Sequence, residues 1–360
     1  MRDAPVHAGP ALEVEDLSVE MLGDHGWTTI VESAGFSLDR GTTLGVVGES
    51  GSGKTVMSLA TMGLLPGRFA RIAHGSVRLQ GEELTGRSER QLQDVRGARM
   101  AMVFQEPMTS LNPAFTIGEQ IAETVRRHLG LGRREAWRRA VEGLERVGIP
   151  RAAQRARSYP HQFSGGMRQR AAIAMALCCE PSVLIADEPT TALDVTMQAQ
   201  ILDLLVELRD ESDLAMVFIS HDLGVVAEIS DRVMVMYAGQ VVEAGPVAGL
   251  YERPHHPYTE ALLAATPRIT ARSGPLEWIP GTPPVPGRFP AGCRFAPRCG
   301  HATEICGEAP IALRPTTVDR ASRCGRVGEL DLRGASEPEG PRPDPKDPVV
   351  PTAPVEVVAR

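Results

Sequence analysis

The chain carries the stretch Gly48-Glu49-Ser50-Gly51-Ser52-Gly53-Lys54-Thr55, which fits the pattern G-x-x-x-x-G-K-[ST]. Glycines here let backbone N–H groups turn inward around phosphates, while a lysine ammonium reaches the outer phosphate oxygens and a threonine hydroxyl ligates Mg²⁺. Lys54 is one of only two lysines among 38 Lys and Arg residues, and the planar fork of arginine does not replace a point charge. The stretch predicts a nucleoside triphosphate site rather than a glycine-rich turn.

The flanking sequence predicts the fold around this stretch. Residues 42–47 are typical of a short buried strand, and residues 56–62 of a helix. The continuous apolar runs 182–186 and 214–219 are typical of strands buried on both faces of a mostly parallel sheet, with a helix at 197–211 between them. The pattern therefore predicts an α/β fold of the P-loop NTPase type.

Composition changes along the chain suggest the domain boundaries. We expect a nucleotide-binding domain at residues 11–250, interrupted by an arginine-rich helical subdomain at about 106–163. Residues 251–328, rich in Pro, Arg and Cys, form a small C-terminal extension, and the proline-rich residues 329–360 are expected to be a disordered tail.

The composition also excludes several classes of protein. The 42% hydrophobic and 23% charged content is ordinary for a globular protein, and a net charge of −7 argues against a nucleic-acid partner. No run approaches the roughly 20 apolar residues of a membrane helix. The first residues lack an apolar signal core, so export is not expected.

Two acidic residues, Asp187 and Glu188, follow the buried run that ends at Ala186. Ligands of α/β proteins gather at the carboxyl ends of strands. Beside the phosphate loop, Asp187 is expected in the shell of Mg²⁺, and Glu188 is expected to polarise the water that attacks the γ-phosphate.

A third motif, Ser164-Gly165-Gly166, opens a predicted helix at residues 167–179. By itself this pattern predicts an ordinary serine N-cap. A second phosphate-ready helix start in one chain is explained if it serves the nucleotide of another subunit.

These motifs, in this order, resemble those of the ATPase subunits of ATP-binding cassette (ABC) transporters. The resemblance makes 48–55 the Walker A loop, Gln105 the Q-loop residue and 163–167 the signature. It makes 183–188 the Walker B motif. Residues 192–194 then resemble the D-loop, and His221 the switch histidine. The implied fold is an ABC ATPase with a RecA-like core, a helical subdomain and an extension.

Further stretches resemble the oligopeptide/dipeptide importer ATPases, namely residues 163–170, 106–113 and 256–263. Met167, at the fifth signature position, resembles the D-type subunit, whose partner is the F-type subunit. The resemblance implies a peripheral protein at the cytoplasmic face of the membrane, paired with an F-type subunit or a second copy. The other implied partners are two permease subunits and, indirectly, a solute-binding protein.

The family implies a role for each site residue. The catalytic residues are Glu188, His221 and Gln105, and Thr55, Gln105 and Asp187 surround Mg²⁺. Met21 stands where the family stacks an aromatic residue on adenine, with Trp27 as the alternative. The remaining ATP-binding residues are Gly48, Glu49, Ser50, Gly51, Ser52, Gly53, Lys54 and Thr55, together with Ser164, Gly165, Gly166 and Asp194, which act on the partner's nucleotide.

The six cysteines form two sets. Cys178 and Cys179 are expected to be small buried hydrophobic residues. Cys293, Cys299, Cys306 and Cys324 form C-x5-C-x6-C-x17-C, which favours a metal over disulfides in a cytosolic chain. Zinc, an iron–sulfur cluster and free or oxidised thiols remain open on the spacing; the family resemblance implies a [4Fe–4S] cluster. We expect the metal to shape the extension without touching ATP chemistry.

The implied function is ATP binding and hydrolysis that powers an importer of di- or oligopeptides or related solutes. One alternative is a soluble cassette ATPase acting on ribosomes or DNA, which would usually have two cassettes or a long coiled coil. Another is an importer ATPase for a non-peptide solute such as a metal chelate.

Overall fold

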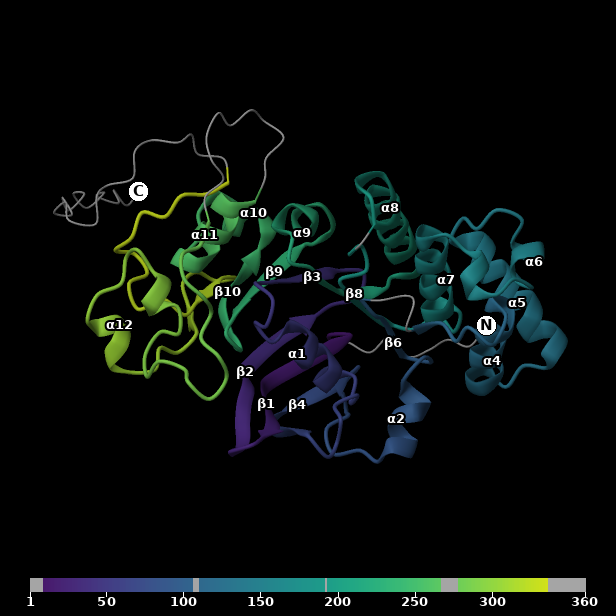
Figure 1. Cartoon of the computed structure of the whole chain (residues 1–360), viewed down its shortest axis with the longest axis horizontal. Helices are drawn as coiled ribbons and strands as arrows, with labels where there is room; N and C mark the ends of the chain where they lie inside the picture. The colour runs from purple at the N-terminus through teal and green to yellow at the C-terminus, as the bar shows by residue number, and fades with distance from the viewer. Residues whose placement is uncertain (1–8, 106–109, 192, 267–277, 336–360) are drawn as a thin grey trace, which may run out of the picture.

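Two β-sheets form the centre of the molecule, with one group of helices at one end and the C-terminal extension at the other (Figure 1). The computed structural model describes residues 9–105, 110–191, 193–266 and 278–335. The expected motif at 106–113 and the D-loop position 192 therefore lie partly outside the described residues.

The larger sheet has the strand order β11-β12-β10-β9-β3-β8-β7-β6. The five strands from β9 to β6 are parallel, and β10 returns antiparallel to β9. Every residue of β3, β7 and β8 is buried, as expected for strands covered on both faces. The strand bounds are Thr43–Val47 (β3), Met100–Val103 (β6), Val183–Asp187 (β7), Ala215–Ile219 (β8), Arg232–Tyr237 (β9), Gln240–Pro246 (β10), Arg314–Pro315 (β11) and Ala321–Ser322 (β12).

The smaller sheet is antiparallel, with the order β2-β1-β4-β5. It packs against helix α1 (Lys54–Thr61) through a shared apolar core that includes Met57 and Val19. Its strands are β1 (Leu12–Gly23), β2 (Gly26–Leu38), β4 (Ala70–Leu79) and β5 (Glu82–Glu83). Strand β2 was not predicted from the sequence. Its pairing with β1 contains register shifts that break the regular alternation of buried and exposed side chains.

Helices α4 to α7 gather at the end of the molecule beyond β6 (Figure 1). Helix α5 packs on the core through Ala136, Ala140 and Leu144, which are all buried. The helices of this group are α4 (Ile117–Leu129), α5 (Arg133–Arg146), α6 (Ala152–Arg155), η1 (Pro160–Gln162) and α7 (Gly165–Leu177). The other helices before the extension are α2 (Glu89–Val95), α8 (Val195–Ser212) and α9 (Leu223–Ile229).

The C-terminal extension is joined to the larger sheet, because β12 pairs with β10 at Glu243 and Ser322. Loops make up most of the extension, and its helices are short. The helices from the end of β10 onward are α10 (Val247–Glu252), α11 (Pro257–Ala265), η2 (Ala296–Arg298) and α12 (Ile305–Glu308).

The expected disordered tail at 329–360 needs a correction at its start. Leu332 is buried, the N–H of Arg333 donates to Glu260 at 2.9 Å, and the N–H of Ala335 donates to the carbonyl of Tyr251 at 2.5 Å. These contacts fix residues 329–335 against α10 and α11. Residues 336–360 lie outside the described residues.

Among the residues that the structure describes, no helix combines the length and the apolar character needed to cross a bilayer.

Candidate active site

The phosphate loop joins β3 to α1, and glycine is required at its first position. A Cβ atom at Gly48, whose φ is 153°, would lie 2.1 Å from the carbonyl oxygen of Met236. The Lys54 ammonium lies across the loop and donates to the carbonyls of Gly48 at 2.7 Å and Glu49 at 3.1 Å. Burial lowers the pKa of Lys54, although the nearby carboxylates of Glu188, Asp187 and Glu49 oppose this shift.

Two of the residues expected around Mg²⁺ are in contact. The Thr55 hydroxyl donates to Oδ1 of Asp187 at 3.4 Å, linking the start of α1 to the end of β7. Burial raises the pKa of Asp187, and the Thr55 hydrogen bond and the Lys54 charge partly offset this. A hydroxyl and a carboxylate are the oxygen ligands that Mg²⁺ prefers, so these residues fit the expected ion.

Glu188 is the meeting point of three polar side chains. Its Oε2 accepts hydrogen bonds from Nε2 of Gln105 at 3.1 Å and from the Thr191 hydroxyl at 2.9 Å. Nδ1 of His221 lies 3.2 Å from the same oxygen. The structure thus brings together all three residues expected to be catalytic, which the sequence separates by up to 116 positions from Gln105 to His221.

Thr191 was missed in the sequence analysis. It lies three residues after Glu188 in the turn that leaves β7, and its N–H donates to the carbonyl of Glu188 at 3.1 Å. Threonine and serine are common in such turns, so only the spacing from Glu188 could have pointed to it.

The expected signature residues stand at the start of α7. Ser164 is the N-cap, and its hydroxyl accepts from the N–H of Met167 at 3.4 Å. Ser164 and Gly165 are exposed, whereas Gly166 is buried against Met197 of α8. Asp194 caps α8 in the same way, accepting from the N–H of Met197 at 2.9 Å. In the described part of the chain, no hydrogen bond joins Ser164, Gly165 or Gly166 to the phosphate loop.

The adenine position stays a prediction. Met21 is half-buried in β1, opposite Thr28 of β2 and Ala70 of β4. The alternative, Trp27, is exposed, and the guanidinium of Arg71 lies 4.2 Å from the centre of its ring. Both residues therefore stay candidates for the base.

The C-terminal extension contacts the phosphate loop directly, through two residues that lie outside the four cysteines. The guanidinium of Arg298 binds the Glu49 carboxylate at 2.6 and 3.0 Å, and the Tyr258 hydroxyl accepts from the N–H of Glu49 at 2.8 Å. Sequence reasoning could not find this pair, because 249 positions separate Glu49 from Arg298.

The four cysteines of the extension line one small cavity, together with His256 and His301. Burial raises the pKa of Cys293 and Cys324, and that of Cys299 to about 12, which favours the protonated thiols. Within the described ranges, however, no three His, Cys, Asp or Glu side chains form a group that could hold a metal ion. Cys178 and Cys179 are buried, as expected.

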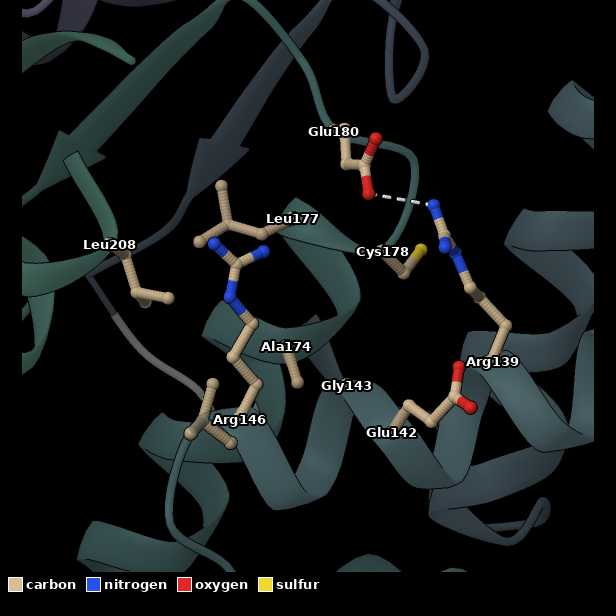
Figure 2. A pocket seen from close by; sticks show the side chains of 10 residues that line it. Arg139, Glu142, Gly143, Arg146, Ala174, Leu177, Cys178, Glu180 and Leu208 are labelled. Atoms are coloured by element: carbon tan, nitrogen blue, oxygen red, sulfur yellow. Dashed lines mark hydrogen bonds and ion pairs between the residues drawn. The ribbon is translucent and has the colours of Figure 1, made fainter. Parts of the chain in front are cut away.

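Another pocket lies between α5, α7 and α8 (Figure 2). Cys178 and Leu208 line it, and an ion pair of 2.7 Å between Arg139 and Glu180 lies at its edge. None of the expected ATP-site residues lines this pocket, so we do not assign it to the reaction.

The phosphate loop, the paired carboxylates and the serine–glycine helix start define an ATPase of the ATP-binding cassette class. The family model for ABC transporters matches residues 31–191, and that for the oligopeptide/dipeptide transporter C-terminal region matches residues 242–306.

Relatives with provisional names as peptide import ATP-binding proteins include two from Brucella abortus. The first is 52% identical over 315 residues, which cover 88% of this chain and 94% of the relative. The second is 49% identical over 332 residues, which cover 89% of this chain and 98% of the relative. The chain belongs to the family of ABC transporter ATP-binding proteins that carry the oligopeptide/dipeptide C-terminal region.

Solved structures show the same fold. cbiO1 from Clostridium perfringens, part of the ABC transporter complex cbiONQ, is similar with a TM-score of 0.58 and 26% identity, covering 68% of this chain and 91% of its own. The cassette MJ0796, solved as a dimer bound to ADP and Pi, has a TM-score of 0.58 and 25% identity. The match covers 66% of this chain and 98% of MJ0796.

Proposed function

We propose that this chain hydrolyses ATP to power the import of peptides through a membrane transporter. One observation carries the proposal: Gln105, Thr191 and His221 converge on a single carboxylate oxygen of Glu188, beside Lys54 and Thr55. The matched C-terminal region and the names of the relatives support peptides as the solute. They favour an importer over a ribosome- or DNA-associated ATPase, and peptides over a metal chelate.

The residues divide the work of phosphoryl transfer. Lys54 and the loop N–H groups hold the phosphates, and the carboxylate of Glu188 accepts a proton from the attacking water. His221 and Thr191 hold that carboxylate in place. Thr55, Gln105 and Asp187 would hold Mg²⁺, which would neutralise phosphate charge.

The exposed Ser164 and Gly165 complete the site of another cassette. Their free helix start offers N–H groups to a phosphate, and Asp194 lies beside it at the start of α8. The dimeric form of MJ0796 supports this arrangement. We propose an F-type subunit, or a second copy of this chain, as the partner.

The rest of the assembly is proposed from the family. Two permease subunits provide the passage, a solute-binding protein delivers the peptide, and this chain is peripheral at the cytoplasmic face. The helices beyond Gln105 are the part that would move against the permeases when the cassettes close.

Cys293, Cys299, Cys306 and Cys324 are proposed to hold a [4Fe–4S] cluster, with zinc as the alternative. The shared cavity and four thiol donors support this. The thiols would have to draw closer together and lose their protons, because they do not form a ligand group in this structure. No step of ATP hydrolysis depends on this metal.

Reconstitution tests the proposal. The chain is combined with its partner cassette, the permeases and the solute-binding protein in lipid vesicles, and uptake of a labelled peptide library is measured with ATP inside or outside. Peptide uptake that needs ATP on the cassette side, and that stops in Lys54→Ala, is expected. ATP hydrolysis stimulated by a non-peptide solute but not by peptides would contradict the proposed solute.

A further inference from the structure

The second residue of the phosphate loop, Glu49, places a negative charge beside the loop that is proposed to hold a triphosphate. Its charge acts on the Lys54 ammonium, where it opposes part of the lowering of the pKa that burial causes. An unpaired carboxylate in this position would repel phosphates, because like charges a few ångströms apart interact strongly away from bulk water. We therefore expect a cationic side chain to pair with the Glu49 carboxylate.

Arg298 is that partner, and it comes from the C-terminal extension. Its Nη1 lies 2.6 Å from Oε2 and its Nη2 3.0 Å from Oε1 of Glu49, which is a bidentate pair. The Arg298 side chain is 4% exposed and that of Glu49 27% exposed, so solvent screens the pair only in part. Nε of Arg298 donates to the carbonyl of Pro280 at 2.8 Å, which orients the guanidinium.

The backbone of Glu49 is held by the same part of the molecule. Its N–H donates to the hydroxyl of Tyr258, a fully buried residue of α11. The ring of Tyr258 packs at 4.5 Å from that of Tyr237 and at 5.3 Å from that of Phe295. Both ends of Glu49 are thus fixed by residues outside the cassette motifs.

A second arginine of the extension supports the far side of the loop. Nη1 of Arg294 donates to the carbonyl of Ala238 at 2.6 Å, and the next residue, Gly239, donates its N–H to the carbonyl of Ser52 at 2.9 Å. Arg294 also pairs with Glu32. Arg294 and Arg298 each adjoin a cysteine of the shared cavity, Cys293 and Cys299.

We propose that Arg298 is a positioning residue of the ATP site: it neutralises Glu49 and holds the phosphate loop open to a triphosphate. The C-terminal extension is therefore a working part of the nucleotide site. This inference rests on the ATP site alone. It holds whichever solute is imported and whichever metal, if any, the cysteines bind.

The test is a double-mutant cycle in the full chain assembled with its partner cassette. The variants are Arg298→Ala, Glu49→Gln and the double variant, with Arg326→Ala as a matched control. Arg326 is a partly buried arginine of the extension that lines the cysteine cavity; its side chain donates to Glu329 and to the carbonyl of His301, far along the chain from the phosphate loop. The Kd of a fluorescent ATP analogue, the KM for ATP, kcat and the melting temperature are measured for each.

Arg298→Ala is expected to weaken ATP binding roughly tenfold and to raise KM to match, with kcat changed less than about threefold. In the Glu49→Gln background the same substitution should weaken binding less than about twofold, because the charge to be neutralised is gone. Arg326→Ala should leave the affinity unchanged.

Equal losses of affinity from Arg298→Ala in both backgrounds would overturn the proposal, since they would assign Arg298 to the folding of the extension alone. Unchanged affinity in Arg298→Ala would overturn it as well. If Arg298→Ala does not fold, Arg298→Lys serves in the same cycle: it keeps the charge, loses the bidentate geometry, and is expected to weaken binding by a smaller factor in the Glu49 background only.

Discussion

A hydrogen bond of 3.1 Å joins Nε2 of Gln105 to Oε2 of Glu188 across 83 positions of sequence. Gln105 lies just beyond β6, where the chain leaves the central sheet for the helices α4 to α7. A movement of those helices therefore acts on the carboxylate proposed to be the general base. This contact offers a direct route by which the position of the helical group and the rate of hydrolysis are coupled.

The role of Glu188 can be tested by Glu188→Gln. The amide cannot accept the proton of the attacking water, so turnover should fall roughly 10²–10⁴-fold while ATP still binds, because the phosphate contacts remain. Steady-state ATPase rates and ATP affinity are measured with the partner cassette present. Hydrolysis within a few-fold of the wild type would remove Glu188 from the role of base.

The shared-site arrangement predicts that the isolated chain hydrolyses ATP poorly and that the partner cassette raises the rate. Because Ser164, Gly165 and Gly166 are proposed to act on the other subunit's nucleotide, a dimer is needed. Activity is followed during titration with the partner, while light scattering reports the oligomeric state. Full activity in a sample shown to be monomeric would contradict the arrangement.

Thr191 gives a milder test of how Glu188 is held. Thr191→Val keeps the shape of the side chain but removes the 2.9 Å hydrogen bond to Oε2. We expect kcat to fall about tenfold with little change in KM, since a bond to a charged group contributes about 1.5–3 kcal/mol. Thr124→Val is the control: its hydroxyl donates to the carbonyl of Gln120 within α4. A drop of similar size in the control would mean a general loss of stability.

His256 predicts how the stability of the folded chain depends on pH. Burial lowers the pKa of His256 to about 3, and its Nδ1 accepts the N–H of Tyr258 at the start of α11. In the unfolded chain this histidine binds a proton below about pH 6.5, whereas in the folded chain it stays neutral down to a pH of about 3. The contribution of neutral His256 to the free energy of unfolding is therefore fully present above pH 6.5. Below pH 6.5 the free energy of unfolding falls, by at most about 1.4 kcal/mol per pH unit, until the pH reaches the folded pKa.

The measurement is thermal melting of the wild type and of His256→Asn between pH 7.5 and 4.5. Asparagine retains an N-cap acceptor but does not titrate in this range. The melting temperature of the wild type should fall more steeply below pH 6.5 than that of the variant. Parallel curves would show that His256 does not contribute to the acid sensitivity.

The cysteine set predicts a bound metal. Protein purified without oxygen should be brown, with broad absorbance near about 400 nm and about four irons per chain. Colourless protein with one zinc would support the alternative. Cys299→Ser should lower the metal content, whereas Cys178→Ala, in the buried pair that directly follows α7, should not. Absence of any metal in both preparations would overturn the proposal.

The chemistry of the site could be predicted because it is carried by local motifs. Lys54, Glu188 and His221 each follow a strand of the parallel sheet, and Asp187 is the last residue of one. The carboxyl ends of such parallel strands lie at one edge of the sheet. Strand β2 escaped prediction because its register shifts hide the two-residue period.

The support of the site could not be predicted in the same way. Glu49 reads as an unremarkable position of the loop, and Arg298 as one arginine among many in a segment of irregular structure. Only the folding of the extension onto β9 and β10 brings them together. Contacts of this kind carry no periodic signal and depend on the whole tertiary fold.

The link between residues 49 and 298 also sets an order of events during synthesis. A nascent chain displays its phosphate loop early, yet the arginine that balances Glu49 is added 249 residues later. At about 5–20 residues per second this delay is roughly 12–50 seconds, during which the growing polypeptide carries the loop with its acidic residue unbalanced. The ribosome must therefore synthesise most of the described chain before Arg298 can pair with Glu49 beside the phosphate loop.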